Sequence, residues 1–238
     1  MQSRLRSFVD LFRNTPFHPQ WFMRDNSFEI QVLQEKATGT VLDIGCASRW
    51  VTNHIAESCL YIGLDYPITG IHMYDSRPDV YSDASQLPFG DQAIDTVILF
   101  QTLEHLSRPH EAIAEIHRVL RPGGSLLLTV PFLYPLHDEP FDFTRFTSHG
   151  LKVLLEKAGF SIDQIKPSLG SAETAGLIVC LSLAGMSFRA LHSRSPSLIL
   201  VPFLALSIPI TNAIFWLLAK MMPSWSAVPA GYRVIARK

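Results

Sequence analysis

The sequence Val41-Leu42-Asp43-Ile44-Gly45-Cys46 is the strongest indication of the fold of this chain. A second stretch, Tyr61-Ile62-Gly63-Leu64-Asp65, follows it and supports the same fold. Each is a short apolar run that stops at a glycine or an aspartate, as is typical of a buried strand that ends in a tight turn. Residues 94–100 and 125–130 form two more such runs, and residues 79–82 are a weaker candidate between them. The sequence therefore predicts a series of strands that begins near residue 40.

Helical stretches separate these strands. The best marked runs from Pro109 to Leu120, where Arg121-Pro122-Gly123-Gly124 stops it and turns the chain into the next strand. A second helix follows Thr147 and ends at Gly159. Because strands alternate with helices, the pattern predicts an α/β fold with a parallel sheet covered on both faces.

The composition limits the class of protein. The chain has 238 residues, 47% of them hydrophobic, which suits one core with an elaboration. Its 20 basic and 21 acidic residues nearly cancel, and they form no basic stripe, so no nucleic-acid partner is expected. Cys46, Cys59 and Cys180 lack the spacing of a disulfide framework or a zinc site, so a reducing compartment and no metal are expected.

Acidic residues mark the strands of the predicted sheet. Asp65 ends the second strand, Asp83 follows the weak third strand, and Asp95 opens the fourth. In open α/β sheets ligands bind beyond the carboxyl ends of the strands. The turn at Gly45 would let backbone N–H groups approach a ligand. Asp65 could accept the two hydroxyls of a ribose, and Asp83 could accept an adenine amino group.

In order and spacing, these motifs resemble the type 11 subgroup of class I S-adenosylmethionine-dependent methyltransferases. The first two stretches look like its first motif and its second-strand motif, and residues 82–89 resemble its adenine-binding loop. Leu103-Glu104-His105 and residues 118–124 resemble the region of its fourth and fifth strands. The resemblance covers about residues 40–165. It implies a Rossmann-like, mostly parallel seven-stranded sheet with helices on both faces. The apolar composition after residue 170 adds a helical insertion before the last strand.

The resemblance also implies that S-adenosyl-L-methionine is the cofactor. The residues expected to bind it are Asp43, Gly45, Cys46, Ala47, Asp65, Tyr66, Asp83, Ala84 and Gln101. One position departs from the family pattern, because Ala47 stands where its loop has a second glycine. Alanine disfavours positive φ, so either the loop adapts or the chain binds the cofactor poorly.

Residues for methyl transfer are expected after the fourth and fifth strands. The candidates are Glu104 and His105, then His137, Asp138, Glu139, Asp142 and Arg145. The loop 131–147 combines aromatic, imidazole and carboxylate side chains, and its resemblance is to a branch associated with polysaccharide or lipid-linked sugar pathways. We expect Tyr134, His137, Asp142 and Arg145 to bind the acceptor.

His137 is the leading candidate for a general base, and His105 is the second. In the alternative interpretation, His137, Asp142 and Arg145 form a hydrogen-bonded cluster that orders the loop. His105 would then belong to packing on the cofactor side.

A strongly apolar segment interrupts the domain near its end. Residues 195–219 contain no charge, a length sufficient to span a bilayer. Because strands on both sides of the segment belong to one sheet in the resembled fold, the chain must return to the side that it left. We expect a monotopic or re-entrant membrane contact through residues 196–222, or else a helix pair packed on the sheet or at a dimer interface.

These observations predict N-terminal helices at 1–38, including an amphipathic one with Leu5, Phe8, Val9 and Phe12 on its apolar face. The methyltransferase domain is expected at 39–170 and 229–238, and the helical insertion at 171–228. The predicted function is O- or C-methylation of a small or lipid-linked acceptor at the cytoplasmic face of a membrane. The competing hypothesis is a non-catalytic cofactor-binding or scaffold protein at a membrane.

Overall fold

The computed structural model describes residues 11–74, 76–193 and 196–238, which form two compact units. We call them the sheet unit, made of Ser27–Phe132, Leu136–Lys166 and Gly231–Lys238, and the hairpin unit, made of residues 11–26, Leu133–Pro135 and Pro167–Ala230. Most of the predicted N-terminal amphipathic helix, with Leu5, Phe8 and Val9, lies outside the described residues.

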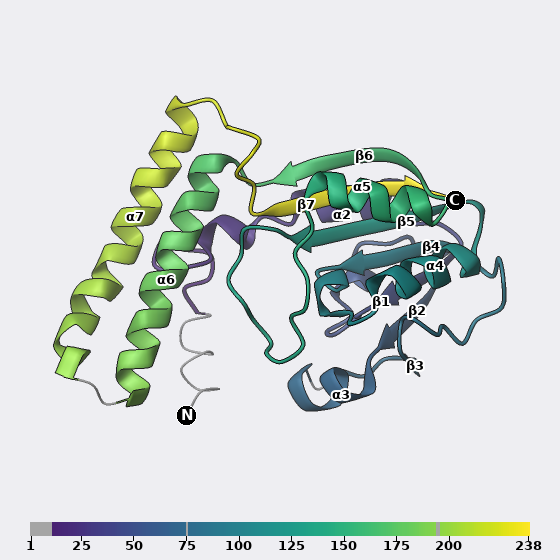
Figure 1. Cartoon of the computed structure of the whole chain (residues 1–238), viewed down its shortest axis with the longest axis horizontal. Coiled ribbons are helices and arrows are strands. Elements are labelled where there is room, and N and C mark those ends of the chain that lie inside the picture. The colour runs from purple at the N-terminus through teal and green to yellow at the C-terminus, as the bar shows by residue number, and fades with distance from the viewer. Residues whose placement is uncertain (1–10, 75, 194–195) are drawn as a thin grey trace. The chain divides into compact units, whose positions relative to one another are not determined.

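A seven-stranded sheet with the strand order β3-β2-β1-β4-β5-β7-β6 forms the sheet unit (Figure 1). The pairs from β3 to β5 are parallel, and β7 runs antiparallel to β5. This confirms the predicted Rossmann-like, mostly parallel sheet. The strands are β1 (Thr40–Ile44), β2 (Leu60–Asp65), β3 (Val80–Tyr81), β4 (Ile94–Phe100), β5 (Leu120–Pro131), β6 (Ser161–Ser168) and β7 (Gly231–Arg237).

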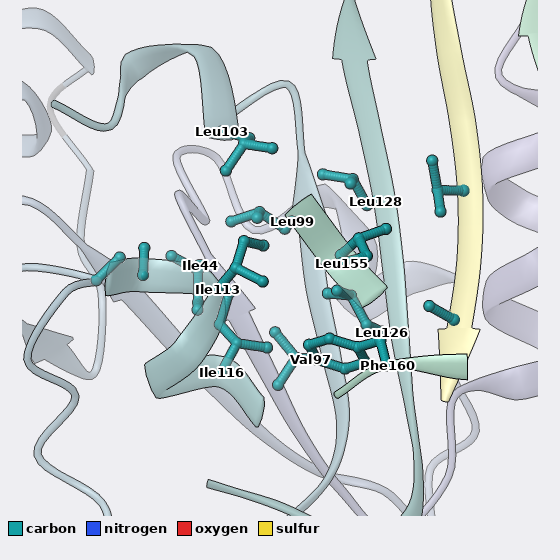
Figure 2. Close-up of a cluster of buried hydrophobic side chains, with 14 of the residues drawn as sticks. Ile44, Val97, Leu99, Leu103, Ile113, Ile116, Leu126, Leu128, Leu155 and Phe160 are labelled. Atoms are coloured by element: carbon teal, nitrogen blue, oxygen red, sulfur yellow. The ribbon is translucent and has the colours of Figure 1, made fainter. Parts of the chain in front are cut away.

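Helices cover both faces of the sheet because the strands are apolar on both sides. In β1, Leu42 and Ile44 belong to one buried cluster, whereas Val41 belongs to another. The first cluster packs against α4 (Pro109–Val119) and α5 (Ser148–Lys157), and Figure 2 shows its side chains. The second cluster lies under α2 (Ser27–Lys36). Shorter helical turns are Trp50–Asn53, α3 (Pro67–Thr69) with Gly70–Tyr74, and Leu103–His105.

Local details of the sheet differ from the prediction. Strand β5 begins at Leu120, directly after α4, and its register with β4 shifts before Ser125. Asp95 lies at the amino end of β4, away from the carboxyl ends, where it accepts hydrogen bonds from the Thr40 amide at 2.8 Å and from Arg121. Asp95 therefore joins neighbouring strands at the opposite edge from the predicted ligand site.

The hairpin unit consists of two long apolar helices, α6 (Ser171–Ser193) and α7 (Val201–Met221), with helical turns at Trp21–Arg24 and Pro196–Leu200. The start of α6 and the residues after α7 are hydrogen-bonded, since the Ser171 amide donates to Ser224 Oγ and the Trp225 amide donates to Ser171 Oγ. The helices therefore form an antiparallel hairpin, and it precedes the last strand as predicted.

Small and polar residues hold the hairpin together. A Cβ at Gly176 would lie 2.7 Å from Phe215 Cβ, so the two helices approach closely there. Asn212 is fully buried, and its Nδ2 donates to the carbonyl oxygens of Pro16 and His18 at 2.6 and 3.1 Å. The segment before Asn26 is thereby tied to α7, and the helix continues through Pro209.

Candidate functional site

The turn after β1 has the backbone conformation that a ligand-approaching loop requires. Gly45 has a φ of +78°, and a Cβ there would overlap the side chain of Thr102, whose Cγ2 would lie 2.8 Å away. The amides of Gly45 and Cys46 both donate to the Leu64 carbonyl oxygen, which ties the turn to β2. Ala47 has a φ of +39°, a region that favours glycine. The alanine that replaces the family's second glycine therefore holds a strained conformation.

Asp65 connects the ends of β1 and β2. Its Oδ2 accepts the Ala47 amide at 3.3 Å, and its Oδ1 accepts the Tyr66 amide at 2.9 Å. The side chain is buried. Each carboxylate oxygen has two lone pairs, so Asp65 retains capacity for the two hydroxyls of a ribose. The structure thus places Ala47, Asp65 and Tyr66, three predicted cofactor residues, beside one another.

Asp43 and Cys46 lie behind this loop and are almost fully buried. Burial raises the pKa of Asp43 to about 6, and the Tyr61 hydroxyl, which donates to Asp43 Oδ2 at 2.7 Å, opposes this rise. Burial also raises the pKa of the Cys46 thiol to about 12. These positions support the loop from inside, and their predicted contact with the cofactor stays a prediction.

Asp83 and Ala84 follow β3 at the same edge of the sheet. Asp83 Oδ1 accepts both the amide and the hydroxyl of Ser85 at 2.8 Å, and Oδ2 accepts Arg108 at 3.0 Å. Burial opposes ionisation of Asp83, but these hydrogen bonds outweigh it and lower its pKa. Ala84 is buried. Asp83 is therefore a fixed, ionised acceptor.

Gln101 follows β4 with a φ of +50°. Its amide donates to the Thr129 carbonyl oxygen at 2.9 Å, and its Nε2 contacts Thr129 Oγ1 at 3.1 Å. The next residue, Thr102, donates to the Ile44 carbonyl oxygen at 3.2 Å. These bonds link the carboxyl ends of β1, β4 and β5.

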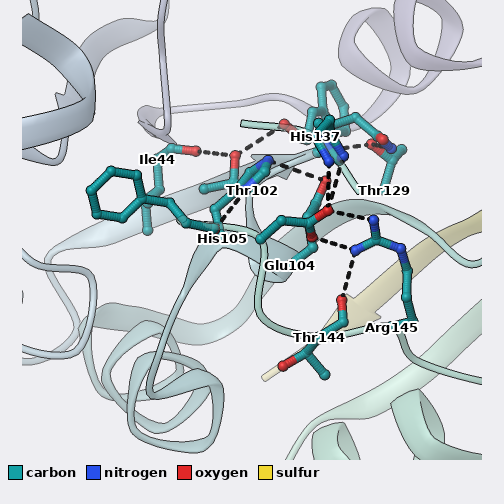
Figure 3. A network of polar contacts seen from close by, with 12 residues as sticks. Ile44, Thr102, Glu104, His105, Thr129, His137, Thr144 and Arg145 are labelled. Carbon is teal, nitrogen blue, oxygen red and sulfur yellow. Dashed lines mark hydrogen bonds and ion pairs between the residues drawn. The ribbon is translucent and has the colours of Figure 1, made fainter. Parts of the chain in front are cut away.

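Three titratable side chains converge beyond β4 and β5 (Figure 3). Each of Glu104, His105 and His137 has one side-chain atom able to bind a metal, and these three atoms lie within 4.8 Å of one another. The imidazole rings of the two histidines are packed edge to face, with their centroids 4.9 Å apart. His105 Nδ1 lies 2.9 Å from the Phe141 carbonyl oxygen, and its Nε2 lies 3.8 Å from Glu104 Oε1. Burial raises the pKa of Glu104 to about 8 and lowers the pKa of His105. The two predicted bases therefore share one site.

Asp142 orients His137 within the loop that follows β5. Its Oδ2 lies 3.1 Å from His137 Nδ1 and accepts the His137 amide at 3.0 Å, while Arg145 clamps both carboxylate oxygens. Burial would raise the pKa of Asp142, but Arg145 and the His137 amide lower it to about 2. This matches the predicted ordering cluster and leaves room for a role of His137 in catalysis.

Tyr134, the remaining predicted acceptor residue, belongs to the hairpin unit, where its hydroxyl accepts a hydrogen bond from Gln20 Nε2. Its contact with an acceptor stays a prediction. The supporting roles of Thr102 and Arg108 were not predicted from the sequence. The glycine at position 45 could have suggested a close contact such as that with Thr102, whereas no sequence signal pointed to Arg108.

Comparison with known proteins identifies the family. A family model described as a methyltransferase domain matches residues 42–128. A Mycolicibacterium smegmatis protein named "Probable S-adenosylmethionine-dependent methyltransferase" is 33% identical over 168 residues, which cover 66% of this chain and 64% of that protein. A demethylmenaquinone methyltransferase of Renibacterium salmoninarum is 31% identical over 119 residues, covering 48% of this chain and 49% of that protein. The chain thus spans less than two thirds of the length of these relatives.

Solved structures agree on the fold. A S-adenosylmethionine-dependent methyltransferase of Archaeoglobus fulgidus superposes with a TM-score of 0.54 at 19% identity, covering 98% of this chain and 99% of that one. The [4+2]-cyclase SpnF superposes with a TM-score of 0.56 at 20% identity, covering 89% and 80%. The matched methyltransferase-domain model and the S-adenosylmethionine-dependent relative, together with the ordered motifs of β1, β2 and the loop after β3, support a class I S-adenosylmethionine-dependent methyltransferase, and the solved structures show the same fold.

Proposed function

We propose that this protein transfers a methyl group from S-adenosylmethionine to an oxygen or carbon atom of a small or lipid-linked acceptor. The observation that carries the proposal is the order of groups along one edge of the sheet. Gly45, Asp65 and Asp83 follow β1, β2 and β3, while the cluster of Glu104, His105 and His137 follows β4 and β5. This arrangement separates a nucleoside-binding half from a polar acceptor half.

The residues after β1 to β3 fit the cofactor that the family implies. A Cβ at Gly45 would overlap the side chain of Thr102, so the glycine lets the turn after β1 pack directly against the end of β4. Two carboxylates, those of Asp65 and Asp83, are fixed by hydrogen bonds at positions suited to a ribose and an adenine amino group. When bound, S-adenosylmethionine supplies an electrophilic methyl group on a sulfonium.

The loop after β5 would hold the acceptor and remove its proton. For a hydroxyl acceptor, the oxygen attacks the methyl carbon, the carbon–sulfur bond breaks, and its electron pair stays on sulfur. The released proton needs a base, and imidazole is suited to that task near neutral pH. His137, oriented by Asp142, is the proposed base, and His105 is the second candidate.

We also propose that the hairpin unit contacts a membrane at the cytoplasmic face. Both helices, Ser171–Ser193 and Pro196–Met221, are long and apolar enough to cross a bilayer by length and composition, with mean hydropathies of 1.6 and 2.1 over an 18-residue window in each. The second helix adds an exposed apolar stripe at helical spacing, formed by Phe203, Leu206, Ile210, Ile214 and Leu217.

The stripe favours an amphiphilic acceptor. An exposed apolar surface of this kind marks an interaction site for lipid or another protein. A hairpin that returns to its starting point can contact lipid while the sheet stays on one side. A lipid-linked sugar or another isoprenoid-bearing acceptor would therefore meet the enzyme at the membrane surface.

One observation favours the competing scaffold hypothesis. The Ala47 amide points at Asp65, and its alanine holds a positive φ, so this N–H is engaged within the protein.

The test is calorimetric titration of the detergent-solubilised full chain with S-adenosylmethionine. Wild type should bind saturably, Asp65→Ala should lose binding, and Asp91→Ala, which changes a carboxylate that is 74% exposed, should bind as wild type does. Transfer of labelled methyl to lipid extracts would then identify the acceptor. Folded wild type that fails to bind S-adenosylmethionine would overturn the methyltransferase proposal.

A further inference from the structure

The carboxyl group of Glu104 is fully buried, and neither of its oxygens has a hydrogen-bond partner among the residues that the structure describes. A buried polar group without a partner costs about 1–3 kcal/mol, so such groups are rare unless a ligand or ion satisfies them. The contacts within the protein therefore do not explain this side chain.

Two imidazoles stand over this carboxyl group. His105 Nε2 lies 3.8 Å from Glu104 Oε1, which is too long for a hydrogen bond. Two donors that bind one cation at about 2.1 Å each lie roughly 3–4.2 Å apart, so this gap matches a shared cation. The donor atom of His137 completes a group within 4.8 Å. A shift of about half an ångström in one imidazole would bring all three to bonding distance.

The groups around the two histidines are those that orient metal ligands. His105 Nδ1 lies 2.9 Å from the Phe141 carbonyl oxygen, and His137 Nδ1 lies 3.1 Å from Asp142 Oδ2. A ligating histidine commonly donates its other ring N–H to a carbonyl or carboxylate in this way. Arg145 in turn holds Asp142 on both oxygens. Ligation of both rings through Nε2 would thus be supported by existing contacts.

We propose that Glu104, His105 and His137 bind a divalent transition-metal ion. Two imidazole nitrogens and one carboxylate oxygen suit Zn²⁺, Mn²⁺, Fe²⁺ or Co²⁺ better than Mg²⁺ or Ca²⁺, which prefer oxygen alone. The Glu104 side chain is fully buried, whereas those of His105 and His137 are 18% and 29% exposed. The ion would therefore be bound on its buried side by Glu104. Its remaining coordination positions would be on the solvent-exposed side, where an acceptor hydroxyl could bind.

This inference rests on the proposed function and assigns its acceptor site to oxygen-bearing molecules. With the ion bound, His137 and His105 both serve as ligands, which replaces the role of either as the direct base. The ion would lower the pKa of a bound acceptor hydroxyl, so that its proton passes to solvent before the oxygen attacks the methyl carbon. The closely spaced Cys and His residues of a typical zinc site are absent from the sequence, which is why the sequence analysis predicts no metal. Here the chain brings together residues 33 positions apart, Glu104 and His137.

The test is a Co²⁺ titration of the chelator-treated full chain, followed by the visible absorption of bound Co²⁺. Wild type should bind one equivalent saturably, and Zn²⁺ should displace it. Glu104→Gln keeps the shape of the side chain but removes its charge, and it should weaken Co²⁺ binding at least tenfold. His105→Asn should do the same, while His149→Ala, which changes an exposed residue of α5, should leave Co²⁺ affinity unchanged.

Calorimetric binding of S-adenosylmethionine, measured on the same samples, shows that each variant is folded and separates the two proposals. Absence of saturable Co²⁺ binding by wild type at millimolar concentration would overturn the metal site and leave cofactor binding untouched. Equal Co²⁺ affinity of wild type, Glu104→Gln and His105→Asn would overturn it as well, because the ion would then be bound elsewhere. Failure of the folded wild-type protein to bind S-adenosylmethionine would instead overturn the proposed function.

Discussion

The amide of Ala47 donates a hydrogen bond of 3.3 Å to Asp65 Oδ2 while Ala47 itself has a φ of +39°. A non-glycine residue in this region is strained by roughly 1–2 kcal/mol. The strain persists at the contact between the first-motif loop and the acidic end of β2. The loop of this chain has therefore kept the glycine-like conformation after losing the glycine.

Ala47→Gly should tighten S-adenosylmethionine binding by a few-fold and stabilise the protein slightly. Relief of about 1–2 kcal/mol of backbone strain is only partly offset by about 0.4–1 kcal/mol of added entropy in the unfolded chain, so the Tm should rise by a few degrees at most. Calorimetry and thermal unfolding measure the two effects. Weaker cofactor binding by the glycine variant would show that the alanine methyl group makes a favourable contact.

Gly45→Ala should reduce both stability and cofactor binding. The new Cβ would overlap Thr102, and the φ of +78° would add strain, for a total cost of about 2 kcal/mol or more. Gly90→Ala is the matched control, because nothing lies within 4 Å of a Cβ there. Chemical denaturation of the two variants should separate them clearly, and equal stabilities would contradict the crowded turn.

Asp43→Asn should remove a pH dependence of stability. The folded-state pKa of Asp43, raised to about 6 by burial, lies above its unfolded value, so ionised Asp43 destabilises the protein. This cost, on the order of 2–3 kcal/mol, is present above about pH 6 and disappears as the pH falls toward 4. The variant should therefore gain stability over wild type at pH 7.5 but little at pH 4.5.

Unfolding free energies of both proteins at the two pH values test this expectation. Glu57→Gln, which changes an exposed carboxylate, serves as the control and should show no such difference. A constant offset between Asp43→Asn and wild type across this range would contradict the raised pKa.

Ile116→Ala should destabilise the sheet unit by about 2–4 kcal/mol. Ile116 on α4 is fully buried in the core of Figure 2, and truncation leaves a cavity in addition to the lost transfer free energy. Val153→Ala on α5, where the side chain is 50% exposed, should cost less than about 1 kcal/mol. Denaturant midpoints would rank the two variants, and similar losses would argue against the packing described.

Phe203→Asp combined with Ile210→Asp should weaken membrane binding. A charged residue within the apolar stripe costs about 2.5–3.5 kcal/mol on transfer into lipid. Flotation with liposomes measures the bound fraction, and Val153→Asp is the control for an added charge elsewhere. Undiminished flotation of the double variant, with its fold intact by circular dichroism, would contradict contact through this stripe.

The sequence allowed the sheet and the nucleoside-binding half to be predicted because both rest on local signals. The apolar stretches that form β1 and β2 end at Gly45 and Asp65. Neighbouring residues in the sequence therefore indicate that they are strands, in which order they come and where they end. The start of α5 was equally predictable, since Thr147 precedes the helix as its N-cap and its hydroxyl oxygen accepts a hydrogen bond from the Gly150 amide.

The acceptor half could be predicted only as a set of candidates. The loop after β5 has no periodicity, so the sequence could not show that His137 approaches His105, or that Glu104 is left without a partner below them. The amino-end position of Asp95 was predicted, but its hydrogen bonds to Thr40 and Arg121 were not, because both partners are distant in the sequence.

The hydrogen bond from the Ala230 amide to the Ser168 carbonyl oxygen brings together the two points where the chain leaves and re-enters the strands on either side of the hairpin. The insertion thus begins and ends at two neighbouring backbone positions. A turn of a few residues could connect these positions directly and leave every strand in its original sequence order. The hairpin is in this sense an exchangeable module, which a lineage could gain, lengthen or discard without redesigning the sheet.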